Sequence, residues 1–187
     1  MKIGVFVGSF NPVHKGHIKI ANYIVDNHYV DKLLIVPTGN YWDKNNIIDV
    51  KHRIKMLEFY ETDKIIIEKE VNNLPYTYQV INELKKRYKD DELALIMGAD
   101  NIVSFDKWKH YEELLKLEFI IYRRNNFDIK HYLDKLGKKD KVVILDNVDS
   151  INISSTQIRE TINEYQNLDE LMDRNIIEYI EKNKLYK

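Results

Sequence analysis

The stretch Gly8-Ser9-Phe10-Asn11-Pro12-Val13-His14-Lys15-Gly16-His17 decides how this chain is interpreted. It follows an apolar run, Ile3–Val7, and precedes a segment at 20–25 with apolar side chains at helical spacing. It therefore predicts a turn between a strand and a helix. Gly8 lets the backbone approach a ligand closely, and Asn11-Pro12 is a turn signal. In an open α/β sheet, ligands bind beyond the carboxyl end of such a strand.

Two histidines close this stretch. His14 and His17 are three residues apart, so on the first turn of a helix they point to the same side. A helix N-terminus favours anions, which suggests a phosphate site. The same pair could be half of a metal site, or could only cap or pack the turn. The stretch is neither a GxxxxGK[ST] loop nor a GxGxxG fingerprint.

Composition narrows the function classes. The 187 residues suit one α/β domain, 1–187, with a sizeable core. A formal net charge of −1 gives no sign of a nucleic-acid or acidic-membrane partner. With no cysteine, disulfides, thiolate catalysis and cysteine zinc sites are excluded. The apolar runs are too short for a signal segment or membrane span, so we expect a cytoplasmic protein; the oligomeric state stays open.

Short apolar runs alternate with helical patterns along the whole chain, which predicts a parallel sheet with crossover helices. The expected strands are Ile3–Val7, Leu33–Val36, Ile65–Glu68, Leu93–Met97, Glu118–Tyr122 and Val142–Leu145. The expected helices are Gly16–Asn27, Val50–Tyr60, Thr77–Arg87, Tyr111–Lys116, Ile129–Leu136, Ser155–Tyr165 and Leu168–Asn183. Right-handed crossovers would give a doubly wound, mostly parallel sheet with helices on both faces and a small helical C-terminal part.

A second candidate anion site lies at Ile153-Ser154-Ser155-Thr156-Gln157-Ile158-Arg159. Ser154 and Gln157 have the spacing of a capping box, which predicts a helix start. Ser155 and Thr156 would add hydroxyls there, and Arg159 would add a planar fork of charged donors one turn later. Taken alone the pattern is ambiguous, because serine and threonine cap many helices.

Three further features admit two interpretations each. The polar loop Pro37–Ile48 carries Tyr41, Trp42 and Lys44, and is either a ligand lid or a solvated loop. Asp100, at the end of the fourth expected strand, could meet a ligand hydroxyl, cap a helix, or do both. Trp108 could be a core residue or a platform for a ring.

The two motifs together resemble a known family. GSFNPVHKGH is similar to the G-[TS]-F-[DN]-P-x-H-x-G-H signature of the nucleotidylyltransferase superfamily, and ISSTxIR is similar to the second signature of its adenylyltransferase branch. Further segments make the chain resemble bacterial nicotinate-nucleotide adenylyltransferase over nearly its whole length: Pro75–Tyr78, Gly98–Asp100, Trp108–Leu115, Arg124 and Tyr179–Tyr186, with Arg53 and Met56 also on the pattern. The resemblance implies a Rossmann-like nucleotidylyltransferase fold.

It also implies a reaction and a site. AMP would pass from ATP to nicotinate mononucleotide, giving nicotinate adenine dinucleotide and pyrophosphate in NAD biosynthesis. Mg²⁺ would bridge the leaving phosphates, held largely by substrate and water. The catalytic residues implied are His14 and His17. The ATP-binding residues implied are Gly8, Ser9, Phe10, His17, Gly98, Asp100, Ser154, Ser155, Thr156 and Arg159. The acceptor-binding residues implied are Asn11, Lys44, Thr77, Tyr78, Asp100, Trp108 and Arg124.

The chain departs from the family at two loops. Tyr41-Trp42-Asp43-Lys44 stands where Pro-Pro-His-Lys is frequent, and Arg124-Asn125-Asn126 stands where Arg-Pro-Gly is frequent. Acceptor identity is therefore less constrained than the chemistry, and nicotinamide mononucleotide or phosphopantetheine are the alternatives. Two other classes remain: a metal-dependent hydrolase using His14, His17 and Asp100, and a nucleotide-sensing module without catalysis.

Overall fold

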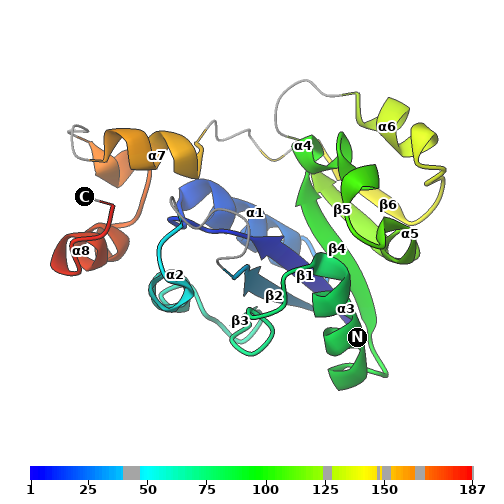
Figure 1. The fold of residues 1–187 in the computed structure, drawn as a ribbon, viewed down its shortest axis with the longest axis horizontal. Helices are drawn as coiled ribbons and strands as arrows, with labels where there is room; N and C mark the ends of the chain where they lie inside the picture. Colours follow the sequence, from blue (N-terminus) through cyan, green and yellow to red (C-terminus); the bar gives the residue numbers. More distant parts are fainter. Residues whose placement is uncertain (40–46, 124–127, 147, 149–152, 163–166, 187) are drawn as a thin grey trace.

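A computed structural model describes all residues except 40–46, 124–127, 147, 149–152, 163–166 and 187. Its centre is a six-stranded parallel sheet with the order β3-β2-β1-β4-β5-β6 (Figure 1). The strands are β1 (Lys2–Gly8), β2 (Lys32–Pro37), β3 (Ile65–Ile67), β4 (Glu92–Gly98), β5 (Glu118–Tyr122) and β6 (Val142–Leu145). The direction of strand addition reverses between β1 and β4, which is where such sheets bind ligands.

Helices cover both faces of the sheet. One face carries α1 (Lys15–Asp26), α2 (Val50–Glu58), α7 (Ser155–Thr161) and α8 (Arg174–Lys182). The other carries α3 (Thr77–Arg87), α4 (Ala99–Ile102), η1 (Phe105–Lys107), α5 (Tyr111–Leu114) and α6 (Ile129–Lys135). Successive side chains of a strand point to opposite faces, so Phe6 packs in the first layer and Val5 in the second. The doubly wound α/β fold predicted from the sequence is confirmed.

Two expectations about particular segments are wrong. The single helix expected at Leu168–Asn183 is wrong: a 3₁₀ turn, η2 (Leu168–Glu170), and α8 are separate. Asp173 between them has extended backbone, with ψ of 151°, and accepts a hydrogen bond from the Tyr60 hydroxyl at 2.7 Å. Asp100 is also not a helix cap, because Gly98 takes that position and Asp100 lies in the first turn of α4.

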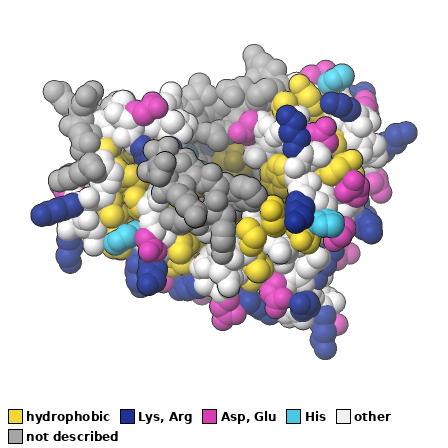
Figure 2. All heavy atoms as spheres, viewed as in Figure 1, with side chains coloured by type: hydrophobic (Ala, Val, Ile, Leu, Met, Phe, Trp, Pro, Cys, Tyr) yellow, Lys and Arg dark blue, Asp and Glu magenta, His cyan; other side chains and the backbone are white. Residues whose placement is uncertain are grey.

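Charge is distributed without a dominant sign. On the face shown in Figure 2, lysine and arginine side chains are interspersed with aspartate and glutamate. This agrees with the net charge of −1. Any anion site must therefore be built from local groups, because long-range attraction between opposite charges is weak here.

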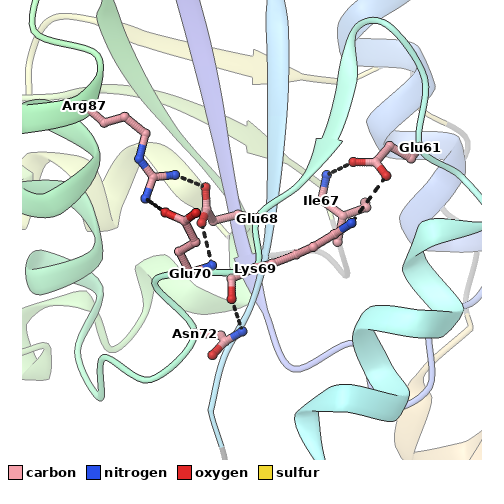
Figure 3. A network of polar contacts seen from close by, with 7 residues as sticks. All are labelled: Glu61, Ile67, Glu68, Lys69, Glu70, Asn72 and Arg87. Carbon is pink, nitrogen blue, oxygen red and sulfur yellow. Dashed lines mark hydrogen bonds and ion pairs between the residues drawn. The ribbon is translucent and has the colours of Figure 1, made fainter.

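A polar network fixes the segment between β3 and α3 (Figure 3). Arg87, at the end of α3, donates to the buried carboxylate of Glu68 at 2.7 Å and to Glu70 at 2.8 Å. The Glu68 carboxylate also accepts from the backbone N–H of Glu70 at 2.8 Å. The network anchors the chain just before Val71 and Leu74, which wall one of the two pockets described next.

Candidate active site

The motif after β1 forms a tight loop at the carboxyl edge of the sheet. A β-carbon at Gly8 would lie 3.1 Å from the ring of Phe10, so the bare backbone of glycine lets that ring pack closely. Phe10 has a left-handed backbone with φ of 46°, and its side chain is buried. The Asn11-Pro12 peptide bond is cis. The helix α1 begins at Lys15, directly after this loop. We call residues 8–14 the phosphate loop, after the anion site that the sequence predicts here.

The two histidines lie side by side as the spacing predicted. Their rings stack with centroids 3.7 Å apart and planes 24° apart. The Nδ1 atom of His17 accepts from the backbone N–H of His14 at 3.3 Å, so in the neutral imidazole the proton is on Nε2. Phe10 packs edge-on against the His17 ring at 4.9 Å. His17 is thus held as an oriented donor.

The second motif lies against the first. The Ser154 side chain accepts from the backbone N–H of Gln157 at 3.1 Å and caps α7, as predicted. The Ser155 hydroxyl donates to the carbonyl oxygen of Pro12 at 2.9 Å. Arg159 donates through Nη1 to the carbonyl oxygen of Asn11 at 2.8 Å and through Nη2 to Thr156 at 3.3 Å. Residues nearly 150 positions apart therefore meet.

Between the motifs is a hollow of about 260 Å³, which we call the polar pocket. It is lined by Ser9, Asn11, His14, His17, Ile47, Ser154, Ser155, Thr156 and Arg159. Hydroxyls, imidazoles and a guanidinium surround it, beside the N-termini of α1 and α7. This arrangement suits a polyphosphate.

Arg53 supports the loops from below. It is fully buried in α2, and burial lowers the pKa of its guanidinium to about 10. It donates to the carbonyl oxygens of Ser9 at 2.6 Å, Thr38 at 2.5 Å and Ile48 at 3.2 Å. The sequence alone predicted no role for Arg53. Its spacing could have indicated burial, because Arg53 precedes Met56 and Leu57 by three and four residues and so shares the apolar face of the helix.

A second hollow of about 410 Å³ lies on the other side of Gly8, and we call it the apolar pocket. Its walls include Val7, Gly8, Val36, Leu74, Pro75, Thr77 and Trp108. The helix α3 begins at Thr77. Its N-cap residue, Tyr76, makes no side-chain capping hydrogen bond to the first turn. Lys107 and Lys109 also line this pocket, and sequence reasoning missed both. The pocket suits a flat ring with an anionic substituent.

The remaining predicted residues are distributed unevenly. Asn11 lines the polar pocket instead of the apolar one. Tyr78 packs against the His110 ring, with ring centroids 4.4 Å apart and planes tilted by 53°. Within the described part of the chain, Gly98 and Asp100 line neither pocket, so Asp100 is not gathered with the histidine pair as a metal hydrolase would require. Lys44 and Arg124, with Tyr41, Trp42 and Asp43, lie outside the described residues.

Comparison with known proteins identifies the family of this chain. The cytidylyltransferase-like family model matches residues 5–161. A protein named probable nicotinate-nucleotide adenylyltransferase in Acholeplasma laidlawii is 39% identical, covering 98% of this chain and 96% of that protein. A protein of the same name in Fusobacterium nucleatum is 33% identical, covering 97% and 98%.

The fold also matches solved structures. Plasmodium falciparum nicotinic acid mononucleotide adenylyltransferase, complexed with NaAD, aligns with a TM-score of 0.85 at 24% identity, covering 99% of this chain and 97% of that one. A nicotinate-nucleotide adenylyltransferase structure from Vibrio parahaemolyticus aligns with a TM-score of 0.68 at 18% identity, covering 99% and 94%. At these identities the structures speak to the fold alone. The chain therefore belongs to the nicotinate-nucleotide adenylyltransferase family of cytidylyltransferase-like proteins, as shown by its full-length identity of up to 39% together with both signature motifs and the doubly wound sheet.

Proposed function

We propose that the protein transfers AMP from ATP to nicotinate mononucleotide, releasing pyrophosphate and forming nicotinate adenine dinucleotide. The observation that carries this is a pair of pockets, one polar and one apolar, lined by adjacent residues at the end of β1. Gly8 lines the apolar pocket and Ser9 lines the polar pocket, so a polyphosphate and a ring could be held on either side of neighbouring backbone. The relatives' names support this choice of reaction.

In this reaction a phosphate oxygen of the acceptor attacks the α-phosphorus of ATP. The bond from the α-phosphorus to the bridging oxygen breaks, and pyrophosphate leaves with the electron pair. A protein nucleophile is not needed, so catalysis consists of alignment and stabilisation of the shifting charge. The Nε2–H of His17 would donate to the α-phosphate oxygens, while Ser155, Thr156 and Arg159 would hold the outer phosphates.

We propose Mg²⁺ as the cofactor, bound mainly by the phosphates of ATP and by water. Among the described residues, no group of three or more histidine, aspartate or glutamate side chains could hold a metal ion. Mg²⁺ prefers substrate phosphates over all-protein cages, so the donor-rich polar pocket is compatible with a metal carried in by ATP. When bound, it would neutralise charge on the leaving group.

The acceptor choice follows from the apolar pocket. Trp108 and Pro75 offer flat walls to a pyridine ring, and Thr77 begins α3 at the same pocket. A carboxylate accepts from backbone N–H groups at a helix start, whereas a carboxamide also brings two donors. Nicotinate mononucleotide therefore fits better than the amide, and the long flexible arm of phosphopantetheine offers no ring to stack.

The test is pyrophosphate release from ATP with each acceptor in turn, followed by identification of the dinucleotide. We expect release with nicotinate mononucleotide, weaker release with the amide, and none with phosphopantetheine. Binding of ATP without release would favour a nucleotide sensor, and hydrolysis without acceptor would favour a hydrolase.

No helix within the described residues has the length and apolar character needed to cross a membrane. The cytoplasmic location and the single-domain organisation expected from the sequence stay predictions.

A further inference from the structure

The last described residues turn back toward the polar pocket. After α8 ends, the backbone N–H of Leu185 donates to the carbonyl oxygen of Ile180 at 3.1 Å, which reverses the chain. Lys184 and Tyr186 then take left-handed backbone conformations, with φ of 52° and 61°. Side-chain-bearing residues disfavour this region, and it persists where surrounding contacts fix it. Contacts of the Tyr186 side chain with the rest of the protein can therefore fix this turn.

Tyr186 contacts the phosphate loop directly. Its hydroxyl donates to Oδ1 of Asn11 at 2.8 Å, across 175 positions of sequence. The same Oδ1 accepts from the backbone N–H of Ile48 at 3.3 Å. The carbonyl oxygen of Asn11 accepts from Arg159 at 2.8 Å. Asn11 is 1% exposed, so this residue is a buried junction of four segments that are distant in sequence.

The hydroxyl of Tyr186 is suited to donate. Burial raises its pKa and outweighs the lowering effect of the nearby Arg53 and Arg159 guanidiniums. It therefore stays protonated at neutral pH. Its contact to Oδ1 is 2.8 Å long, an ordinary length for a bond between a hydroxyl and an oxygen, so it helps to fix the position of the Asn11 side chain.

The position of the phosphate loop matters for rate. Ser9, Asn11, His14 and His17 all line the polar pocket, and the loop is connected to α7 through Arg159. Misplacement of reacting groups by about 1 Å can lower a rate by roughly a hundredfold. Ile48, Arg159 and Tyr186, which contact Asn11, do not line the apolar pocket, so acceptor binding should not depend on these three contacts.

We propose that Tyr186 is a positioning residue for adenylyl transfer, which fixes the phosphate loop by hydrogen bonding to Asn11 from the far end of the chain. It acts through Asn11 and does not need to touch either substrate. The inference rests on the adenylyl transfer proposed above.

The experiment compares Tyr186→Phe with the matched control Tyr179→Phe. Tyr179 lies on α8 in the same C-terminal part, but its hydroxyl contacts Nδ1 of His52 on α2 at 2.9 Å, away from the phosphate loop. We expect Tyr186→Phe to lower kcat/KM for ATP about tenfold or more, with the Kd of nicotinate mononucleotide alone unchanged within about twofold. Tyr179→Phe should leave kcat/KM for ATP within about twofold. Thermal unfolding of both variants reports the purely structural part.

A double-variant cycle tests the route through Asn11. Asn11→Leu should lower kcat/KM for ATP, and adding Tyr186→Phe should lower it no further, because the leucine has already removed the Oδ1 that accepts from the Tyr186 hydroxyl. Unchanged kcat/KM in Tyr186→Phe, equal losses in both tyrosine variants, or additive losses in the cycle would each overturn the proposal. Failure of the wild type to release pyrophosphate would instead overturn the proposed function. In that case the Kd of ATP, measured by calorimetry for the wild type, both single variants and the double variant, tests the Tyr186–Asn11 coupling without turnover.

Discussion

His17→Ala tests the centre of the mechanism. The wild-type ring is held on three sides: it stacks on His14, meets the edge of Phe10 at 4.9 Å and accepts from the His14 N–H at 3.3 Å. Its Nε2–H is therefore oriented before substrate arrives. Removing one such oriented donor to developing charge costs about 3 kcal/mol, or roughly a hundredfold to a thousandfold in kcat. We expect that loss in kcat with only a few-fold change in the Kd of ATP, because the other donors of the polar pocket remain.

The assay is pyrophosphate release at saturating ATP and acceptor, with calorimetric ATP binding measured separately. His52→Ala is the matched control, since His52 lies on α2 against Tyr179 and lines neither pocket. His17→Asn should recover part of the loss, because its shorter amide keeps an acceptor and a donor. A folded His17→Ala protein that turns over within about threefold of wild type would refute the assigned role.

Further outcomes are expected for Arg159, for Arg53 and for the apolar pocket. Arg159→Ala should raise KM for ATP about tenfold or more and leave KM for the acceptor unchanged, and lysine should rescue only in part because it lacks the planar fork; equal effects on both KM values would place Arg159 elsewhere in the site. Arg53→Met should lower the free energy of unfolding by about 2–4 kcal/mol in chemical denaturation, since three carbonyl oxygens lose their donor. A change under about 1 kcal/mol would mean that the desolvation cost of burying the guanidinium nearly cancels the free energy of its hydrogen bonds. The kcat/KM of nicotinate mononucleotide should exceed that of nicotinamide mononucleotide by roughly tenfold to a hundredfold, because a buried unpaired donor costs ~1–3 kcal/mol; a higher kcat/KM for the amide would contradict recognition of a carboxylate at the start of α3. Trp108→Ala should weaken the binding of both acceptors alike.

Local sequence patterns were enough to predict the elements. The strands Glu118–Tyr122 and Val142–Leu145 and the helix Thr77–Arg87 have the bounds that their periodicity predicted. The reason is that alternation at two and at 3.6 residues depends on near neighbours alone. The two motifs were also placed correctly, one after the first strand and one at a helix start, because capping and turn chemistry are local.

Where local and tertiary requirements compete, the pattern failed. Residues 168–183 have helical spacing throughout, but Asp173 is held in extended backbone and accepts from Tyr60, 113 positions away. A contact at that sequence separation leaves no trace in local periodicity. The helix Ala99–Ile102 was not predicted for a different reason: it is a single turn, too short to produce a periodic pattern.

By itself, the sequence determined the fold class, the place of the two signature motifs and the family, because these depend on residue types at fixed spacing. Only the tertiary structure decided which side chains share a pocket: Asn11 faces the polar side, Gly98 and Asp100 line neither pocket, and Arg53 lies buried beneath the loops. It alone brings Tyr186 to Asn11. Strand order and crossover packing set these distances, and the free energy of that packing is spread over contacts between residues far apart in the chain.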